Sequence, residues 1–170
     1  MRHLLTLLLF INLTLVSAGI DKEPVKEVQF KTLTNFELPI EVAYFAEKEQ
    51  LEEVKKAIPK EIKILDGKKV KIKGFMIPVV YNKDYKVTSF VFAPDQTSCC
   101  FGKVPKLNGF IFSSNDKGVD NFKDMLIEVT GTLTTEPKFY KDQECVLIYK
   151  LKVESVKKLQ LNGPSKGIGF

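Results

Sequence analysis

The sequence predicts a mainly β protein, a small five-stranded barrel preceded by one helix. From residue 69 onward, apolar and polar residues alternate with the period of two that is typical of half-buried strands. Gly74 and Gly131 stand inside two of these alternating segments. Because glycine in a strand allows the sharp bend of a barrel corner, this pattern favours a partly open barrel of the OB type. A β-sandwich is the alternative.

One amphipathic helix is predicted near residues 47–57, ahead of the strands. Leu51, Val54 and Ile58 recur at i, i+3 and i+7, and charged residues fill most other positions. The acidic residues come first and the lysines last, which suits the helix dipole. Pro59 disfavours a helical conformation in the residue before it, so the helix should end just ahead of this proline.

Five strands are predicted after the helix. They cover residues 69–76, 87–93, 110–113, 125–135 and 145–156. Asp66 and Gly67 form a turn signal before the first strand, and residues 82–86 form a polar turn after it. Residues 115–123 are polar and predict a turn-rich connection.

The first 18 residues have the pattern of a secretory signal peptide. A charged start precedes an apolar run over residues 4–16, and Ala18 predicts cleavage before Gly19. The run is shorter than the roughly 20 apolar residues of a membrane-spanning helix, although an uncleaved anchor is the alternative. We therefore expect a periplasmic or secreted protein with no transmembrane span after cleavage.

The expected mature chain forms one domain with flanking segments. Residues 19–57 are an N-terminal lead that contains the helix, residues 58–160 are the β domain, and residues 161–170 are a flexible, glycine-rich tail. Cleavage removes the only arginine and the only histidine, which leaves 25 lysines against 21 acidic residues and a net charge of +4.

This composition excludes several classes of function. Without histidine, the mature chain lacks the commonest general base and the commonest neutral metal ligand. The sequence has no phosphate loop and no nucleophile elbow, so we expect a non-enzymatic protein. Without arginine, and with an export signal, nucleic acid is not an expected partner. Several aromatic residues offer either a binding surface or, more commonly, core packing: Phe75, Tyr81, Tyr85, Phe90, Phe92, Phe101 and Phe110.

Cys99 and Cys100 are adjacent within a loop over residues 94–109, which we predict to be the binding loop. Its candidate residues are Pro94, Cys99, Cys100, Phe101, Gly102, Pro105 and Asn108. The two thiolates can bind a soft ion such as zinc or copper. In an oxidising compartment they can instead pair with each other or with Cys145. The sequence leaves the pairing and the metal open, and core packing is the plain alternative for Cys145.

Several motifs between residues 58 and 156 resemble a bacterial family described as domain of unknown function 3299. The matching stretches are residues 65–78, Phe90 to Pro94, Cys99 to Gly102, Pro105, Asn108, Gly131 to Leu133 and the closing strand with Tyr149. Many family members have Cys-x-His in the loop, whereas this chain has glycine at position 102 in place of the histidine.

This resemblance implies a role in the cell envelope. Family members are exported or lipid-anchored, their genes often lie beside ABC-transporter components, in some cases in zinc-responsive clusters, and no enzymatic activity is established for them. We therefore expect an accessory or binding component of an envelope transport or metal-homeostasis system, with a transporter or lipoprotein as its partner. The alternative is a thiol-based metal-binding or redox protein that acts through Cys99 and Cys100.

Overall fold

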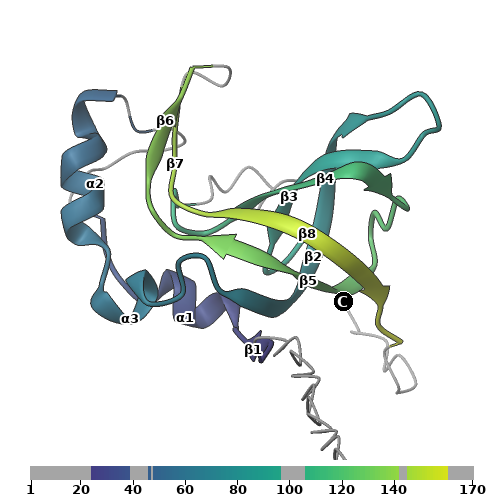
Figure 1. Ribbon diagram of the computed structural model, residues 1–170, viewed down its shortest axis with the longest axis horizontal. Coiled ribbons are helices and arrows are strands. Elements are labelled where there is room, and N and C mark those ends of the chain that lie inside the picture. Colours follow the sequence, from purple (N-terminus) through teal and green to yellow (C-terminus); the bar gives the residue numbers. More distant parts are fainter. Residues whose placement is uncertain (1–23, 39–45, 47, 97–105, 142–144, 161–170) are drawn as a thin grey trace, which may run out of the picture.

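The structure is a computed structural model that describes residues 24–38, 46, 48–96, 106–141 and 145–160. Strands dominate it, and short helices lie at one end of a barrel (Figure 1). No helix in this part of the chain has the length and apolar character that a membrane crossing demands. The predicted signal segment with Ala18 and Gly19, and the predicted tail over residues 161–170, lie outside the described residues.

Five strands close into the barrel. They are β2 (Lys69–Tyr81), β3 (Val87–Ala93), β4 (Ile111–Val119), β5 (Leu126–Thr134) and β8 (Lys150–Lys158). The order is β2-β3-β4-β8-β5, and β5 pairs back to β2. Only the β4–β8 pairing is parallel among these five strands. This arrangement confirms the mainly β, OB-like prediction over the sandwich, and the barrel is closed.

The predicted alternation fills the barrel interior. Every second residue is buried along β5 and along the first part of β2, namely Val70, Ile72, Gly74 and Met76 in β2 and Ile127, Val129, Gly131 and Leu133 in β5. Both glycines allow close backbone approach. A Cβ at Gly74 would lie 2.5 Å from the carbonyl oxygen of Ala93, and one at Gly131 would lie 2.3 Å from that of Lys152. These positions therefore require glycine at the bends of the barrel.

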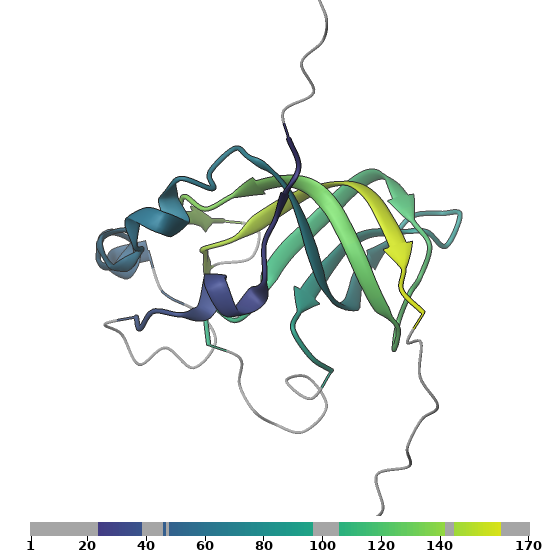
Figure 2. The ribbon, with the colours of Figure 1, turned by 90° about the horizontal axis from the view of Figure 1, so that it is seen from below.

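Three short helices precede the barrel strands where the sequence predicts one. A 3-10 turn, η1 (Lys48–Gln50), leads into α2 (Leu51–Ala57), within the segment predicted as helical. The additional helices are α1 (Phe30–Thr34) and α3 (Lys60–Lys63). They span only five and four residues, too few for an apolar period to show in the sequence. Figure 2 shows the helices together on one side of the barrel.

Two predicted segments differ from the structure. The predicted turn-rich stretch begins as a strand, since β4 continues to Val119, which pairs with Val87 of β3. The predicted last strand is interrupted. Its first part, β7 (Cys145–Leu147), pairs with β6 (Lys138–Tyr140) in a separate two-stranded sheet, and β8 begins at Lys150. A short strand, β1 (Lys26–Glu27), adds to β2 in parallel.

Candidate functional site

The predicted binding loop connects β3 to β4, and the structure describes its two ends. Pro94, directly after β3, is exposed, whereas Asn108, near the start of β4, is buried. The other candidate residues lie outside the described residues: Cys99, Cys100, Phe101, Gly102 and Pro105. Zinc or copper binding by the two cysteines, and their pairing with Cys145, therefore stay predictions.

Asn108 fixes the second end of this loop to the N-terminal part of the chain. Its side chain is 1% exposed, and its Nδ2 donates a hydrogen bond to the carbonyl oxygen of Phe36 at 2.9 Å. Leu107 beside it is buried, and the amide of Gly109 donates to the carbonyl oxygen of Lys106 at 2.6 Å. The Oδ1 atom of Asn108 is buried with no hydrogen-bond partner among the described residues. This asparagine is thus a structural anchor of the loop.

The N-terminal segment covers the barrel at the end where the loop begins. The hydroxyl of Tyr149 donates to the carbonyl oxygen of Leu33 in α1 at 2.7 Å, and burial raises the pKa of this hydroxyl well above its usual range. The rings of Phe30 and Phe92 lie 5.3 Å apart between their centroids. We call this end, formed by α1, α2, α3 and the strand ends that they cover, the capped end.

A hollow of about 310 Å³ opens at the capped end. Its lining residues are Lys55, Lys63, Asp66, Thr135, Glu136 and Pro137. The backbone amide of Thr135 donates to Oδ1 of Asp66 at 2.7 Å, and the Thr135 hydroxyl is buried with no partner in the described part of the chain. The formal charges of the lining residues balance, so the hollow favours neither anions nor cations.

The opposite end of the barrel carries a projecting hairpin, in which the sequence singled out only Tyr81, Tyr85 and Phe90, as aromatic residues of either a binding surface or the core. We call residues 76–90 the hairpin arm, because β2 and β3 extend there past the end of the β2–β5 pairing, with β4 beside β3 as far as Val119 (Figures 1 and 2). Val79, Val80 and Tyr81 are each about half exposed, and Tyr85 in the turn is 86% exposed. Phe90, by contrast, is completely buried and belongs to the core.

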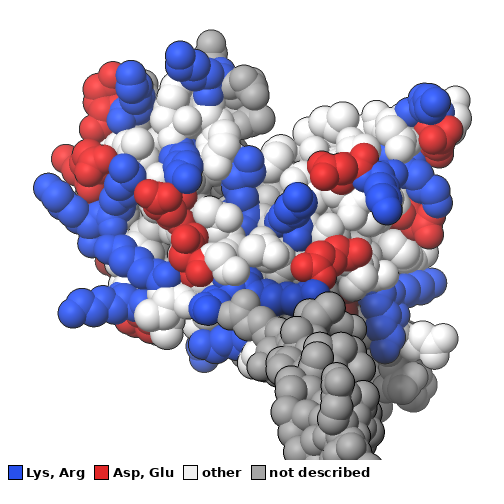
Figure 3. All heavy atoms as spheres, in the orientation of Figure 1, with Lys and Arg blue, Asp and Glu red and all other residues white. Residues whose placement is uncertain are grey.

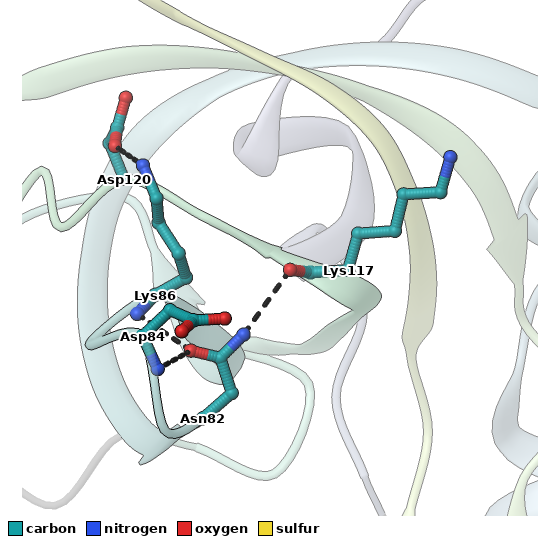
Figure 4. Close-up of polar contacts among 5 residues, drawn as sticks. All are labelled: Asn82, Asp84, Lys86, Lys117 and Asp120. Atoms are coloured by element: carbon teal, nitrogen blue, oxygen red, sulfur yellow. Dashed lines mark hydrogen bonds and ion pairs between the residues drawn. The ribbon is translucent and has the colours of Figure 1, made fainter.

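Asn82 organises the turn of the hairpin arm (Figure 4). Its Oδ1 accepts hydrogen bonds from the amides of Asp84 and Lys86, both at 3.0 Å. Its Nδ2 donates to the carbonyl oxygen of Lys117 in β4 at 3.3 Å. Lys86 also forms an ion pair with Asp120. The turn is therefore held against the end of β4 and presents a defined shape.

The family model for "Protein of unknown function (DUF3299)" matches residues 19–158. The chain belongs to this family. The match confirms the resemblance and extends it to the N-terminal lead. A DUF3299 family protein from Pseudomonas aeruginosa PAO1 has a similar crystal structure, with a TM-score of 0.58 and 20% sequence identity over 82% of this chain and 99% of that one. At this identity the likeness shows the fold alone. No curated protein matches the chain.

The described residues of this DUF3299 family member contain no group of three His, Cys, Asp or Glu side chains placed to hold a metal ion. Their charges are mixed in sign. Lysines and acidic residues lie interspersed over the face in Figure 3, and ion pairs join Lys71 to Glu128 and Lys73 to Glu27 across the outer surface. The candidate binding surfaces are therefore the predicted loop, whose second end is anchored at the capped end, and the hairpin arm at the opposite end.

Proposed function

We propose that this DUF3299 family member is an exported, non-enzymatic binding module that serves as an accessory component of an envelope transport or metal-homeostasis system. The observation that carries this proposal is the anchoring of the second end of the β3–β4 loop, where Asn108 is buried and bonded to Phe36. Side chains such as Phe90 and Phe92 fill the barrel interior beneath it. A partner therefore meets the outside of the barrel, where the anchored second end of the loop lies.

Two features of the sequence support the envelope as the place of action. The first 18 residues have the pattern of a secretory signal. The family resemblance implies exported proteins whose genes lie beside transporter components. We infer that the partner is a subunit of an envelope transporter or a lipoprotein that exposes its binding surface outside the cytoplasm.

Site-specific photo-crosslinking in the producing cells tests this proposal. A photoreactive amino acid replaces Pro94, which is exposed at the first end of the loop, and the control replaces Lys152, which is exposed on the outer wall of β8. We expect a discrete adduct from position 94 only, and mass spectrometry should identify a transporter subunit or a lipoprotein in it. Failure to form an adduct at position 94, or the same adduct from both positions, would contradict the proposal.

A thiol-based function is the second candidate, favoured by the adjacency of Cys99 and Cys100 in a chain with an export signal. Native mass spectrometry with and without reductant, after incubation with Zn²⁺ or Cu(I), distinguishes the two candidates. Stoichiometric metal uptake that is lost in a double Cys99→Ser, Cys100→Ser variant but kept in Cys145→Ser supports it. Unreactive thiols without metal uptake count against it.

A further inference from the structure

The hairpin arm concentrates exposed apolar side chains. Seven large hydrophobic residues are exposed in the described part of the chain, and four of them lie between positions 79 and 85. A register shift between β2 and β3 falls at Val79, and the consecutive residues Val79, Val80 and Tyr81 are each about half exposed. Solvent therefore reaches three consecutive apolar side chains at the end of β2. Exposed apolar residues that gather in one segment in this way mark a candidate interaction site.

One edge of the hairpin arm is also unpaired. The pairing of β2 with β5 ends at Phe75, which lies opposite Leu126, whereas the pairing with β3 continues from Phe75 to Tyr81. Among the described residues, no strand pairs with the other edge of β2 beyond Phe75. An unpaired edge offers main-chain donors and acceptors in the geometry that an added strand requires.

The charges near the turn disfavour two other classes of occupant. Lys83 and Asp84 stand at the tip, and Lys86 pairs with Asp120 just behind it. Inserting this tip into a lipid bilayer would bury charges of both signs, which is costly. Binding to a nucleic acid requires an excess of positive charge, and these four side chains balance. An uncharged, extended polypeptide matches both the apolar side chains and the free edge.

We propose that residues 76–81 of β2 bind an extended, apolar peptide segment of a partner protein by strand addition. Main-chain hydrogen bonds along the free edge would supply affinity, and Val79, Val80 and Tyr81 would contact alternating side chains of the peptide. Pro78 has no amide hydrogen to donate. If two copies of the chain paired symmetrically along this edge, both strands would lack that donor. The partner is therefore a different polypeptide. Because the turn of the hairpin arm and the β3–β4 loop lie at opposite ends of β3, this inference stands independently of the proposed function.

Peptide selection on the full chain tests this inference. A phage library of random dodecapeptides is selected on the wild-type protein, and a selected peptide is synthesised with a fluorescent label for anisotropy titration. We expect at least tenfold weaker binding to Val79→Lys, and no more than a twofold change with Ile64→Lys, which alters another exposed apolar residue in the segment after α3. Tyr81→Ser is a second variant at the hairpin arm, and circular dichroism checks that each variant is folded.

Backbone methylation of the peptide separates strand addition from simple apolar contact. Two versions of the peptide are compared, one N-methylated at the odd positions and one at the even positions. The version whose methylated amides face β2 should bind at least tenfold more weakly, and the other should bind nearly as well as the unmodified peptide. Several results would overturn the inference: no selected peptides, equal binding to Val79→Lys, or indifference to N-methylation. Self-association of the wild type that Val79→Lys abolishes would assign the edge to a second copy. Binding to phosphatidylglycerol vesicles that Val79→Lys abolishes would assign it to a membrane.

Discussion

Replacing Tyr149 by phenylalanine tests whether a buried hydrogen bond holds the capped end to the barrel. Tyr149 is 1% exposed, and its hydroxyl donates to the carbonyl oxygen of Leu33 at 2.7 Å. Leu33 lies in the last turn of α1, where a helix leaves its carbonyls without partners inside the helix. Phenylalanine keeps the ring but leaves this carbonyl unpaired, which costs about 1–3 kcal/mol.

Urea denaturation at pH 7 measures the effect. We expect Tyr149→Phe to lower the free energy of unfolding by about 2 kcal/mol with an unchanged m value. Hydrogen exchange should accelerate in residues 30–36, which the bond holds in place. Tyr85→Phe is the matched control, because its hydroxyl is on a residue that is 86% exposed, and its effect should stay below about 0.5 kcal/mol. Equal losses in the two variants would refute the reasoning.

The same pair of proteins gives a pH dependence with a definite sign. Burial raises the pKa of Tyr149 above the ordinary value of about 10 that applies in the unfolded chain. Above pH 10 the unfolded state therefore releases a proton that the folded state keeps, so the contribution of Tyr149 to stability falls, by at most about 1.4 kcal/mol per pH unit. Tyr149→Phe lacks this contribution. The stability gap between wild type and Tyr149→Phe should narrow between pH 9 and pH 11, and a widening gap would contradict the assignment.

Four further substitutions test the packing and the turns. Asn108→Ala removes the bond that anchors the loop and should lower the free energy of unfolding in urea by about 1–2 kcal/mol. Gly131→Ala places a methyl group against the Lys152 carbonyl and should cost about 3 kcal/mol. Gly67→Ala meets open space but a positive φ of 69°, and should cost only about 1 kcal/mol. Asn82→Ala should lower the melting temperature by about 3 °C through loss of the turn network, as measured by calorimetry.

Where one face of a strand is buried, the sequence pattern predicted the structure well. Alternation in β2 and β5 places Ile72 and Val129 in the core because a shift by one residue would expose the whole apolar set. The sequence also predicted a special role for the glycines inside these strands. Gly74 and Gly131 lack a side chain where the backbone of a neighbouring strand comes too close for a Cβ atom.

The pattern failed where distant pairing outweighs local preference. Asn115 and Gly118 favour turns, yet β4 passes through them as an irregular stretch, because β3 pairs with Ser114 and again with Val119 across a register shift. The break between β7 and β8 is also hidden in the sequence, since Ile148 and Tyr149 are both buried and continue the apolar run. There the chain passes from the small sheet to the barrel, a change of partner that no local signal records.

The roles of the candidate-site residues also depend on contacts that the local sequence does not reveal. Asn108 was predicted as part of a binding loop, but its bond to Phe36 joins residues 72 positions apart, so its anchoring role emerges only in the fold. Val79 and Val80 belong to an apolar run that is typical of a buried strand. Their exposure depends on where the barrel ends along β2, which composition and periodicity do not specify.

The free edge of the hairpin arm is a consequence of barrel closure. β2 has 13 residues and pairs with two different strands along its length. Its first half pairs with β5, and its second half pairs with β3. Bending at Gly74 transfers the strand from one neighbour to the other, so residues beyond Phe75 keep one unpaired edge. Proteins protect such edges with proline, irregular register and charge, and Pro78, the register shifts beside it and the charged tip supply all three. These three features oppose self-association, and they leave Val79, Val80 and Tyr81 exposed. This combination is expected of an edge that binds a different protein.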